Sequence, residues 1–436
     1  MPLKKKNCGT LVKSNCHKDI ISNLPDSLRE TILIFLPLQD AVRTSVLSSK
    51  WRYTWTKIPH LDFDNKIWPG SSGGDQLERQ NKCVRRILHV LLQHEGPITS
   101  LYLSIPELEI FPEIDNLMVL LSKSDVEDLT LLFWSGDHYK LPSTFFKCQR
   151  LKSLYLMSCL VHPPSDFIGF SQLLTIDMFS VAIGSEQLES LIACCPLLEY
   201  LKLENFSVYE ALEIQAPKLK YFKFNGEVES VCFKNTPLLE EIVIVNDSHI
   251  QIGKESSFYG ESNLIGLFGS LPALSVLHFD NLFIQFSAAS VVLKRSSLTA
   301  LHLNTLKLEG ICLEKMGEMT GVLFIVRISP NLQGIKIRLL NPTCAADQKF
   351  LSPESLNVEE YLDLKLDQLR RVELEGFTGT RNQMALAKLL LIKSPGLMKM
   401  IIEPNAQFCD ETKGFLILKE LIRLPRPSTA AEIIYG

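Results

Sequence analysis

A pattern of six residues, apolar at its first, fourth and sixth positions, recurs twelve times and restricts the possible folds more than any other feature. Eight clear copies begin at residues 151, 198, 219, 239, 274, 298, 332 and 369. Four weaker copies begin at residues 98, 126, 173 and 397, so that successive copies start 20 to 37 residues apart. This period indicates a stack of similar units that share one continuous core.

Each copy predicts a strand with one buried face, because its last two apolar residues alternate with polar ones. The chain must then cross back over the core before the next parallel strand begins. Within residues 185–201, Leu188, Leu191 and Ile192 recur at helical spacing, and Pro196 ends the helix before the next copy. A similar proline-x-leucine opening precedes the copies at 219, 239, 274, 332 and 397.

These repeats resemble a leucine-rich-repeat solenoid with irregular units, of the kind found in plant proteins. The resemblance implies an α/β fold in which a right-handed, horseshoe-shaped solenoid occupies residues 98–350. An unrelated α/β core is the less favoured alternative, because so many copies share the proline opening. The gaps at 239–274, 298–332 and 332–369 exceed a normal unit and predict a bulge or break there.

Residues 19–64 precede the repeats and predict three short helices. Pro25 suits the first turn of one helix, and Pro37 ends its apolar run, formed by Leu28, Ile32, Phe35 and Leu36. Asp40 is a candidate cap for a second helix, and a third, from Ser48 or Ser49, places Trp51 and Trp55 on one face. Three short helices form a marginal core at best. The surplus apolar side chains therefore either pack on the first repeats or form a docking face for another protein.

The order of motifs in this segment favours docking. Leu24-Pro25, the central Pro37, Val46-Leu47-Ser48 and Trp51-Arg52 resemble an F-box at the spacing of that family. In F-box proteins this module binds the Skp adaptor of a cullin-RING ubiquitin ligase. The resemblance implies that the adaptor is contacted by Leu24, Pro25, Leu28, Ile32, Leu33, Leu36, Pro37, Ala41, Val42, Ser45, Leu47 and Trp51.

The C-terminal part of the chain completes the resemblance. Residues 386–404 and 416–436 resemble the FBD region that closes many plant F-box/leucine-rich-repeat proteins. The predicted organisation is a disordered tail at 1–18, an F-box at 19–64, a linker and capping helix at 65–97, leucine-rich repeats at 98–350, and an FBD region with terminal repeats at 351–436. The turn-rich linker is 68–74, and the capping helix is marked by Val84, Ile87, Leu88, Leu91 and Leu92.

Composition limits the classes of partner and compartment. With 46% hydrophobic and 22% charged residues the chain is an ordinary globular protein. Its net charge of −4 predicts no nucleic-acid binding, and no apolar run is long enough to cross a membrane. No signal peptide is visible, and the eleven scattered cysteines indicate reduced thiols. We therefore expect the protein in the nucleus, the cytoplasm or both.

The sequence predicts no catalytic site, metal site or cofactor. The glycines at 70, 73 and 74 lack the lysine and the strand–helix frame of a phosphate loop, and His94-Glu95 lacks a second histidine. Cys8 and Cys16-His17 fit a disordered tail better than a metal site. Cys194-Cys195 suits packing between repeats better than nucleophilic work. A triad assembled from distant residues stays open at this point.

The strand residues that alternate with the buried leucines would lie on the concave face of a solenoid, where such proteins hold ligands. The candidates for target binding are Tyr155, Tyr200, Lys202, Tyr221, Lys223, His278, His302, Lys336 and Arg338, followed along the strip by Arg371 and Glu373. Neighbouring units would place Tyr200 beside Tyr221 and Lys202 beside Lys223. This strip predicts a site for an acidic or phosphorylated peptide. The alternative is that these are ordinary solvated strand residues.

Together these features predict a non-catalytic substrate receptor. The F-box would bind a Skp-type adaptor, and through it cullin and RING subunits, while the repeats and FBD region bind an unknown target protein. One alternative is a co-receptor whose concave face binds a small molecule, such as a hormone or an inositol phosphate. Another is an interaction scaffold that has lost its coupling to the ligase.

Overall fold

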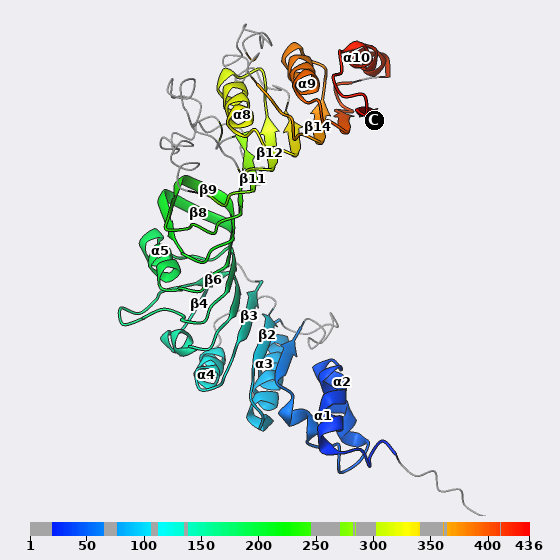
Figure 1. The fold of residues 1–436 in the computed structure, drawn as a ribbon. Coiled ribbons are helices and arrows are strands. Elements are labelled where there is room, and N and C mark those ends of the chain that lie inside the picture. The colour runs from blue at the N-terminus through cyan, green and yellow to red at the C-terminus, as the bar shows by residue number, and fades with distance from the viewer. Residues whose placement is uncertain are drawn as a thin grey trace, which may run out of the picture. The chain divides into compact units, whose positions relative to one another are not determined.

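The computed structural model (Figure 1) describes residues 20–64, 76–105, 112–134, 138–245, 271–281, 284, 302–340, 361, 364–409 and 411–436. The chain divides into two compact units, Met1–Tyr102 and Leu103–Gly436, here called the N-terminal unit and the repeat unit. The predicted tail at 1–18 and linker at 68–74 lie outside the described residues. None of the helices in these described ranges is both long and apolar enough to span a membrane.

The N-terminal unit is mainly helical. Its elements are α1 (Asp26–Ile34), α2 (Leu38–Arg43), η1 (Thr44–Val46), η2 (Thr54–Lys57), β1 (His60–Phe63), α3 (Gln76–Gln93) and the start of β2 (Ser100–Ile105). Pro25 and Pro37 stand directly before α1 and α2, where a missing N–H costs no helical hydrogen bond. Asp40 is therefore not the cap of α2 but lies in its first turn, 2.9 Å from the Arg43 guanidinium.

The third predicted helix is not an α-helix. Turns lead from residue 49 to the short 3-10 helix η2, and the segment still brings both tryptophans into the interior. The core of the N-terminal unit is formed by Leu33, Ala41, Trp51, Trp55 and Ile58. Val90 of α3 packs against this cluster, so α3 supports the F-box segment. The predicted apolar face of α3 is wrong at Leu92, which is exposed.

The repeat unit contains one parallel sheet whose strands follow chain order. They are β3 (Asp128–Phe133), β5 (Ser153–Met157), β7 (Thr175–Phe179), β8 (Tyr200–Gln215), β9 (Tyr221–Lys234), β10 (Glu241–Val245), β11 (Val276–Asp280), β12 (Thr305–Ile311), β13 (Gly334–Leu339), β14 (Arg371–Phe377), β15 (Lys399–Pro404) and β16 (Glu432–Tyr435). With two exceptions, β12 and β16, each begins at the third residue of a predicted copy. The pattern therefore predicted most of this sheet correctly.

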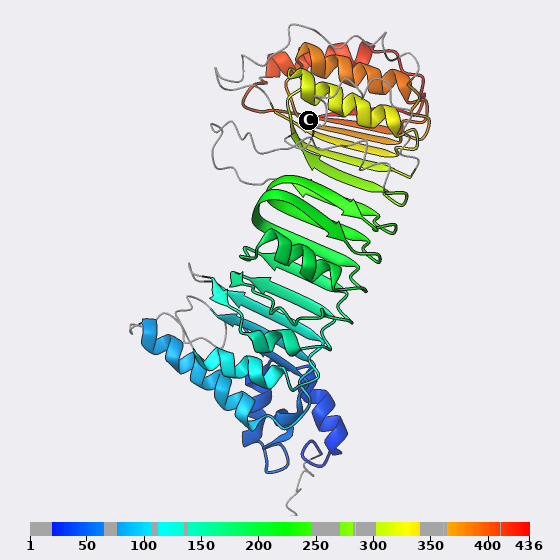
Figure 2. The same cartoon turned by 90° about the vertical axis from the view of Figure 1, so that its left-hand side faces the viewer.

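Helices cover one face of the sheet. The helical elements are α4 (Pro112–Leu121), η4 (Ser143–Lys147), α5 (Ser185–Ala193), α8 (Met316–Ile328), α9 (Arg381–Lys393) and α10 (Glu411–Arg423), and a small separate sheet joins β4 (Tyr139–Lys140) to β6 (Cys159–Leu160). Figure 2 shows α5, α8 and α9 on the same side of the strands. As predicted, α5 buries Leu188, Leu191 and Ile192.

One predicted strand is misplaced. Residues 298–301 lie outside the described residues, and His302, predicted to lie in the strand of this copy, is exposed in a turn. Strand β12 begins instead at Thr305, and Leu306, Leu308 and Ile311 are its buried residues. The hexapeptides that begin at residues 298 and 303 both fit the apolar template. The one at 303 contains the residues that pair in register with β11 and β13. The register shifts at the end of β12, between Leu308 and Ile311, as it also does within β8, so the bulge or break predicted for the long gaps stays a prediction.

The segment predicted as the FBD region extends the same sheet. Strands β14, β15 and β16 pair in parallel, continuing from β13 without a break in strand order. Thr380 caps α9 by accepting a hydrogen bond from the Gln383 N–H, as helix caps do. This region therefore adds further units to the stack, in addition to whatever binding role it has.

Backbone geometry favours particular residues five positions after the start of several strands. Ser158 and Ser180, directly after β5 and β7, have φ angles of 53° and 51°, and Asn205, within β8, has φ 55°. The equivalent residue of β9, Gly226, has φ 146°, and a Cβ there would lie 1.9 Å from the Phe206 carbonyl oxygen. Small polar residues and glycine tolerate positive φ angles, which accounts for the residue types at these positions.

Candidate functional site

The F-box segment exposes an unusual amount of apolar surface. Of the twenty-three large hydrophobic side chains exposed in the described part of the chain, ten lie within residues 20–53. They are Ile20, Ile21, Leu28, Ile32, Ile34, Phe35, Leu36, Val46, Leu47 and Tyr53. Soluble chains rarely leave such a concentration uncovered unless another surface packs against it.

The predicted adaptor contacts divide into three groups. Pro25, Leu28, Ile32, Leu36, Pro37 and Leu47 are exposed, and Leu24, Val42 and Ser45 are half-buried. Leu33, Ala41 and Trp51 are almost fully buried. These three side chains belong to the buried cluster in which the elements of the F-box segment pack together. The structure therefore does not support the prediction that they contact the adaptor directly. The remaining nine are accessible to a partner.

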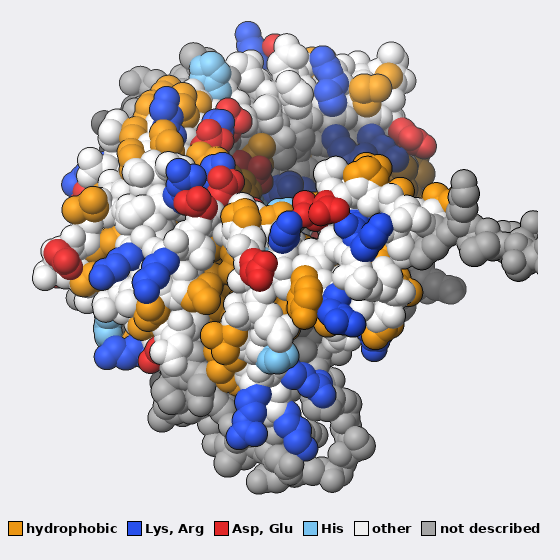
Figure 3. Space-filling model, turned by 90° about the horizontal axis from the view of Figure 1, so that it is seen from below, with side chains coloured by type: hydrophobic (Ala, Val, Ile, Leu, Met, Phe, Trp, Pro, Cys, Tyr) orange, Lys and Arg blue, Asp and Glu red, His pale blue; other side chains and the backbone are white. Residues whose placement is uncertain are grey.

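The most exposed apolar side chains here were not among the predicted contacts. Phe35 is 82% exposed and Val46 is 88% exposed. Both had a signal in the sequence, since Phe35 belongs to the helical run of Leu28 and Ile32, and Val46 belongs to the Val46-Leu47-Ser48 motif of the F-box resemblance. Figure 3 shows hydrophobic side chains in several groups on the face seen from below, with charged side chains between them.

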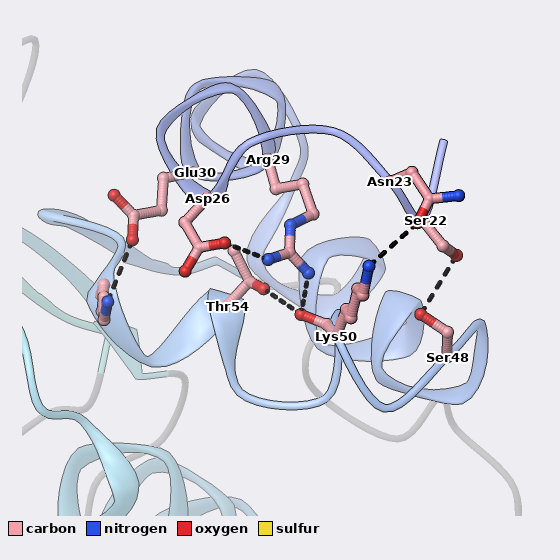
Figure 4. A network of polar contacts seen from close by, with 9 residues as sticks. Ser22, Asn23, Asp26, Arg29, Glu30, Ser48, Lys50 and Thr54 are labelled. Carbon is pink, nitrogen blue, oxygen red and sulfur yellow. Dashed lines mark hydrogen bonds and ion pairs between the residues drawn. The ribbon is translucent and has the colours of Figure 1, made fainter. Parts of the chain in front are cut away.

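A polar network fixes the position of α1 (Figure 4). The buried Arg29 guanidinium donates to the Lys50 carbonyl oxygen and pairs with Asp26. Lys50 Nζ in turn donates to Asn23 Oδ1 at 2.9 Å. A second link joins the hydroxyls of Ser22 and Ser48 at 3.1 Å. These bonds tie α1 to the turn before η2, so the inner face of α1 stays closed and its apolar outer face stays presented.

The second candidate surface is the face of the repeat sheet opposite the buried leucines, here called the open face. From β7 to β14 its residues are at least partly exposed, except Val243, Val245 and Asp280, which are buried. It is formed by the first, third and fifth residues of the strands, and from β7 to β14 these are Thr175, Asp177, Phe179, Tyr200, Lys202, Glu204, Tyr221, Lys223, Asn225, Glu241, Val243, Val245, Val276, His278, Asp280, Thr305, Lys307, Glu309, Gly334, Lys336, Arg338, Arg371, Glu373 and Glu375. Register places equivalent positions of neighbouring strands side by side.

The predicted pairs of side chains are confirmed. Tyr200 is the register partner of Tyr221, and their rings stack with centroids 4.4 Å apart and planes 2° from parallel. Lys202 is the register partner of Lys223. Tyr155 occupies the third position of β5, as expected. His302 does not lie on the open face, and Lys307 takes the place predicted for it, between His278 and Lys336.

The lysines of β8 and β9 are held by carboxylates. Lys202 Nζ lies 2.8 Å from Glu204 and 3.2 Å from Asp177, and Lys223 Nζ lies 2.5 Å from the same Glu204. Burial raises the pKa of Asp177, and Lys202 only partly opposes this. Burial acts in the same sense on Glu204, but its two ammonium partners prevail and hold the pKa of Glu204 below its usual range.

A second ionic cluster covers β11 to β14. Glu309 accepts contacts from His278 at 3.3 Å and Arg338 at 3.1 Å, and Arg338 also lies 3.1 Å from Glu375. Lys336 pairs with Glu375, and Arg371 pairs with Glu373. The basic strip predicted from the sequence is therefore neutralised by neighbouring carboxylates. The prediction of a site for an acidic or phosphorylated peptide loses its basis. It was made from the basic residues of the strip, without most of the carboxylates that pair with them.

Comparison with known proteins identifies the family. The chain is 34% identical to the F-box/FBD/LRR-repeat protein At1g13570 of Arabidopsis thaliana, over 96% of this chain and 98% of that protein. The chain belongs to the F-box/FBD/LRR-repeat family. It is also 26% identical to the F-box/FBD/LRR-repeat protein At3g26920 of the same plant, over 99% of both chains. The F-box/LRR-repeat protein At4g14103 is 30% identical over 48% of this chain and 56% of its own length.

Two family models match separate parts of the F-box/FBD/LRR chain. The F-box domain model matches residues 21–62, which lie in the N-terminal unit and include α1, α2, η1 and η2. The model of the LRR repeats of the FBD-associated F-box protein At5g56370 matches residues 114–337, which run from α4 into β13. The FBD strands β14 to β16 lie beyond this matched segment, and β14 pairs with β13, where the match ends.

Cys195, one of the cysteines considered for chemistry, is a packing residue, whereas Cys8 and Cys16 lie outside the described residues. Cys195 is buried at the end of α5, and burial raises the pKa of its thiol to about 11. Its Sγ donates to the Leu191 carbonyl oxygen at 3.2 Å. A thiol in this state is largely protonated at neutral pH and is a weak nucleophile. Among the described residues, histidines, cysteines and carboxylates form no group of three that could hold a metal ion.

Proposed function

We propose that this F-box/FBD/LRR protein is the substrate-recognition subunit of a Skp–cullin–F-box ubiquitin ligase. The F-box binds a Skp-type adaptor, which connects to cullin and RING subunits, and the repeats bind a target protein. A separate E2–RING pair then transfers ubiquitin. The receptor contributes by proximity, since it raises the effective concentration of target lysines near the charged E2.

The observation that carries the proposal is the exposed apolar face of the F-box segment. Leu28, Ile32, Phe35 and Leu36 lie on α1 or just after it, and all four are exposed. The interior of the N-terminal unit is already filled by its own cluster, closed by Val90 of α3. These four exposed side chains are therefore not needed for the core of this unit. A partner with an apolar groove would remove them from water.

The repeats support the target-binding half of the proposal. Parallel strands in chain order give one long face of side chains held in fixed register. We infer that they wind as a right-handed solenoid, because connections between neighbouring parallel strands are right-handed in about 98% of cases. The horseshoe curvature of the family stays a prediction. A small-molecule co-receptor is less favoured, because the described bases of the open face are largely paired with carboxylates.

Co-expression of the full chain with a plant Skp adaptor tests the proposal. The complex is purified through a tag on the adaptor, and its mass is measured by light scattering after size exclusion. A stable one-to-one complex is expected. A soluble monomeric chain that does not bind the adaptor would contradict the proposal and favour a scaffold without ligase coupling.

A further inference from the structure

The charges of the open face are paired with one another almost throughout. Between β7 and β14, the Asp, Glu, His, Lys and Arg side chains of the open face have partners, with two exceptions. Within the described part of the chain, Glu241 on β10 and Lys307 on β12 form no ion pair or hydrogen bond through their side chains. They are of opposite sign, and both are half-exposed.

Glu241 stands beside an aromatic face. It is the register partner of Tyr221, whose other neighbour is the stacked Tyr200. The ring separation of 4.4 Å is close to the roughly 4.8 Å between strands, so the two rings stack along the direction that crosses the strands. The free face of Tyr221 is therefore turned toward β10. A carboxylate next to an aromatic face suits a guanidinium group, which can pair with one and stack on the other.

Lys307 stands among bases. Its register partners are His278 on β11 and Lys336 on β13. His278 contacts Glu309, and Lys336 is held by Glu375, so the ammonium group of Lys307 is the one left without a carboxylate among these described neighbours. A carboxylate from outside would find an unpaired cation here, with further bases on both sides.

The two unpaired charges are close enough for one short segment. They are two strands apart, about 10 Å, and two residues apart along the strand direction, about 7 Å. The combined separation of about 12 Å equals that of side chains four positions apart in an extended peptide.

We propose that the open face binds a target segment with one basic side chain, held by Glu241 and Tyr221, and one acidic side chain about four residues away, held by Lys307. The proposal rests on the proposed function, in which the repeats recognise a target protein. It names the chemistry of that target: a bipolar segment, and neither a purely acidic nor a purely basic one. A purely acidic segment would place a carboxylate beside Glu241, and a purely basic one would place a cation beside Lys307. The neighbouring charges are already paired and would not compensate for either repulsion.

Defined peptides test this on the full chain in complex with the adaptor. Three nine-residue peptides share one sequence except at two positions four apart, which are Arg and Glu, two Arg, or two Glu. Fluorescence anisotropy measures their affinities at low salt. The Arg/Glu peptide is expected to bind about tenfold more tightly than the other two. Equal affinity of the three, or absence of binding by all of them, would overturn the proposal.

Charge reversal locates the two sites. Glu241→Lys is expected to move the preference to the two-Glu peptide, and Lys307→Glu to the two-Arg peptide. The double variant should again prefer the Arg/Glu peptide, bound in the opposite direction. Glu432→Lys is the matched control, because it reverses an exposed glutamate at the same strand position on β16 and should change no preference. Preferences that ignore both reversals would contradict the assignment.

The same samples separate this proposal from the function on which it rests. Adaptor binding depends on the F-box and should be unchanged in every open-face variant. If the adaptor binds and the peptide preference is absent, only the bipolar target is wrong. If the adaptor does not bind, the ligase function fails whatever the peptides show.

Discussion

The F-box segment and the open face of the repeats are the two surfaces for which we propose protein binding, and they are built in opposite ways. The F-box exposes bare apolar side chains such as Phe35 and Val46 over a core that is already complete. The open face exposes charged side chains that already have partners, as Lys202 and Glu204 do. An apolar surface gains free energy from any partner of matching shape, whereas a paired charge must be matched or replaced. The comparison indicates strong, general binding by the F-box and selective binding by the repeats.

The largest expected effect separates the F-box core from its surface. Trp51→Ala should lower the free energy of unfolding of the N-terminal unit by about 3–5 kcal/mol, because it empties a buried aromatic site. Tyr53→Ala is the matched control, since Tyr53 is an exposed aromatic two residues away and should change stability little. Denaturant unfolding measures both. Equal effects of the two would show that the boundary between core and surface is misplaced.

Removing one surface contact should come next in size. Leu36→Asp should weaken adaptor binding by about 2–4 kcal/mol, because it places a charge within the apolar face, and it should leave unfolding unchanged. Leu92→Asp is the control, since Leu92 is an exposed leucine on α3, outside residues 20–53. Calorimetric titration with purified adaptor measures the affinities. A Leu36→Asp variant that binds normally would remove Leu36 from the contact surface.

A smaller effect distinguishes the two carboxylates that hold Lys202. Glu204→Gln should destabilise the repeat unit by about 1 kcal/mol. The ammonium groups of Lys202 and Lys223 lower the pKa of Glu204, so the ionised carboxylate stabilises the folded state. That contribution is present above the ordinary pKa of 4.5 and disappears as the pH falls through the lowered value. Asp177→Asn should not destabilise, because burial raises the pKa of Asp177 and its ionised form opposes folding as the pH rises through that value. Denaturation at pH 7 and pH 3 measures both variants, and a loss for Asp177→Asn as large as that for Glu204→Gln would contradict this account.

The smallest expected effect is that of salt on the two surfaces. Raising the ionic strength from about 0.05 to 0.5 M should change adaptor affinity less than about twofold, because apolar contacts are not screened. Binding of a charged peptide to the open face should weaken several-fold over the same range. Titrations of one preparation with each ligand compare the two. An adaptor affinity that falls as steeply as the peptide affinity would remove the contrast between the surfaces.

Much of the sheet could be predicted because a buried strand face leaves a clear alternation in the sequence. The pattern became ambiguous where two overlapping hexapeptides, at 298 and 303, both met it. Strand pairing decides between them, since only residues 305–308 match the register of β11 and β13. Pairing is a long-range property that no local pattern contains. The short edge strand β16 was missed for a related reason, because its residues are only partly buried.

The site could be predicted in outline but not in its details. In α1 the adjacent residues Ile32 and Leu33 are both apolar, and the sequence does not show which one faces inward. The structure decides it through Arg29, which shares the inner face with Leu33. On the open face the bases were found and their carboxylates were overlooked. Whether a charge is paired depends on the neighbouring strand, and hence again on register.

The central claim is that the adaptor covers the F-box face and leaves the open face free. Hydrogen–deuterium exchange of the full chain, alone and with the adaptor, tests it directly. The account predicts slower exchange in peptides from residues 20–53 and no change in those from 200–245 or 302–340. Protection of the strands, or no protection of α1 and η1, would contradict it.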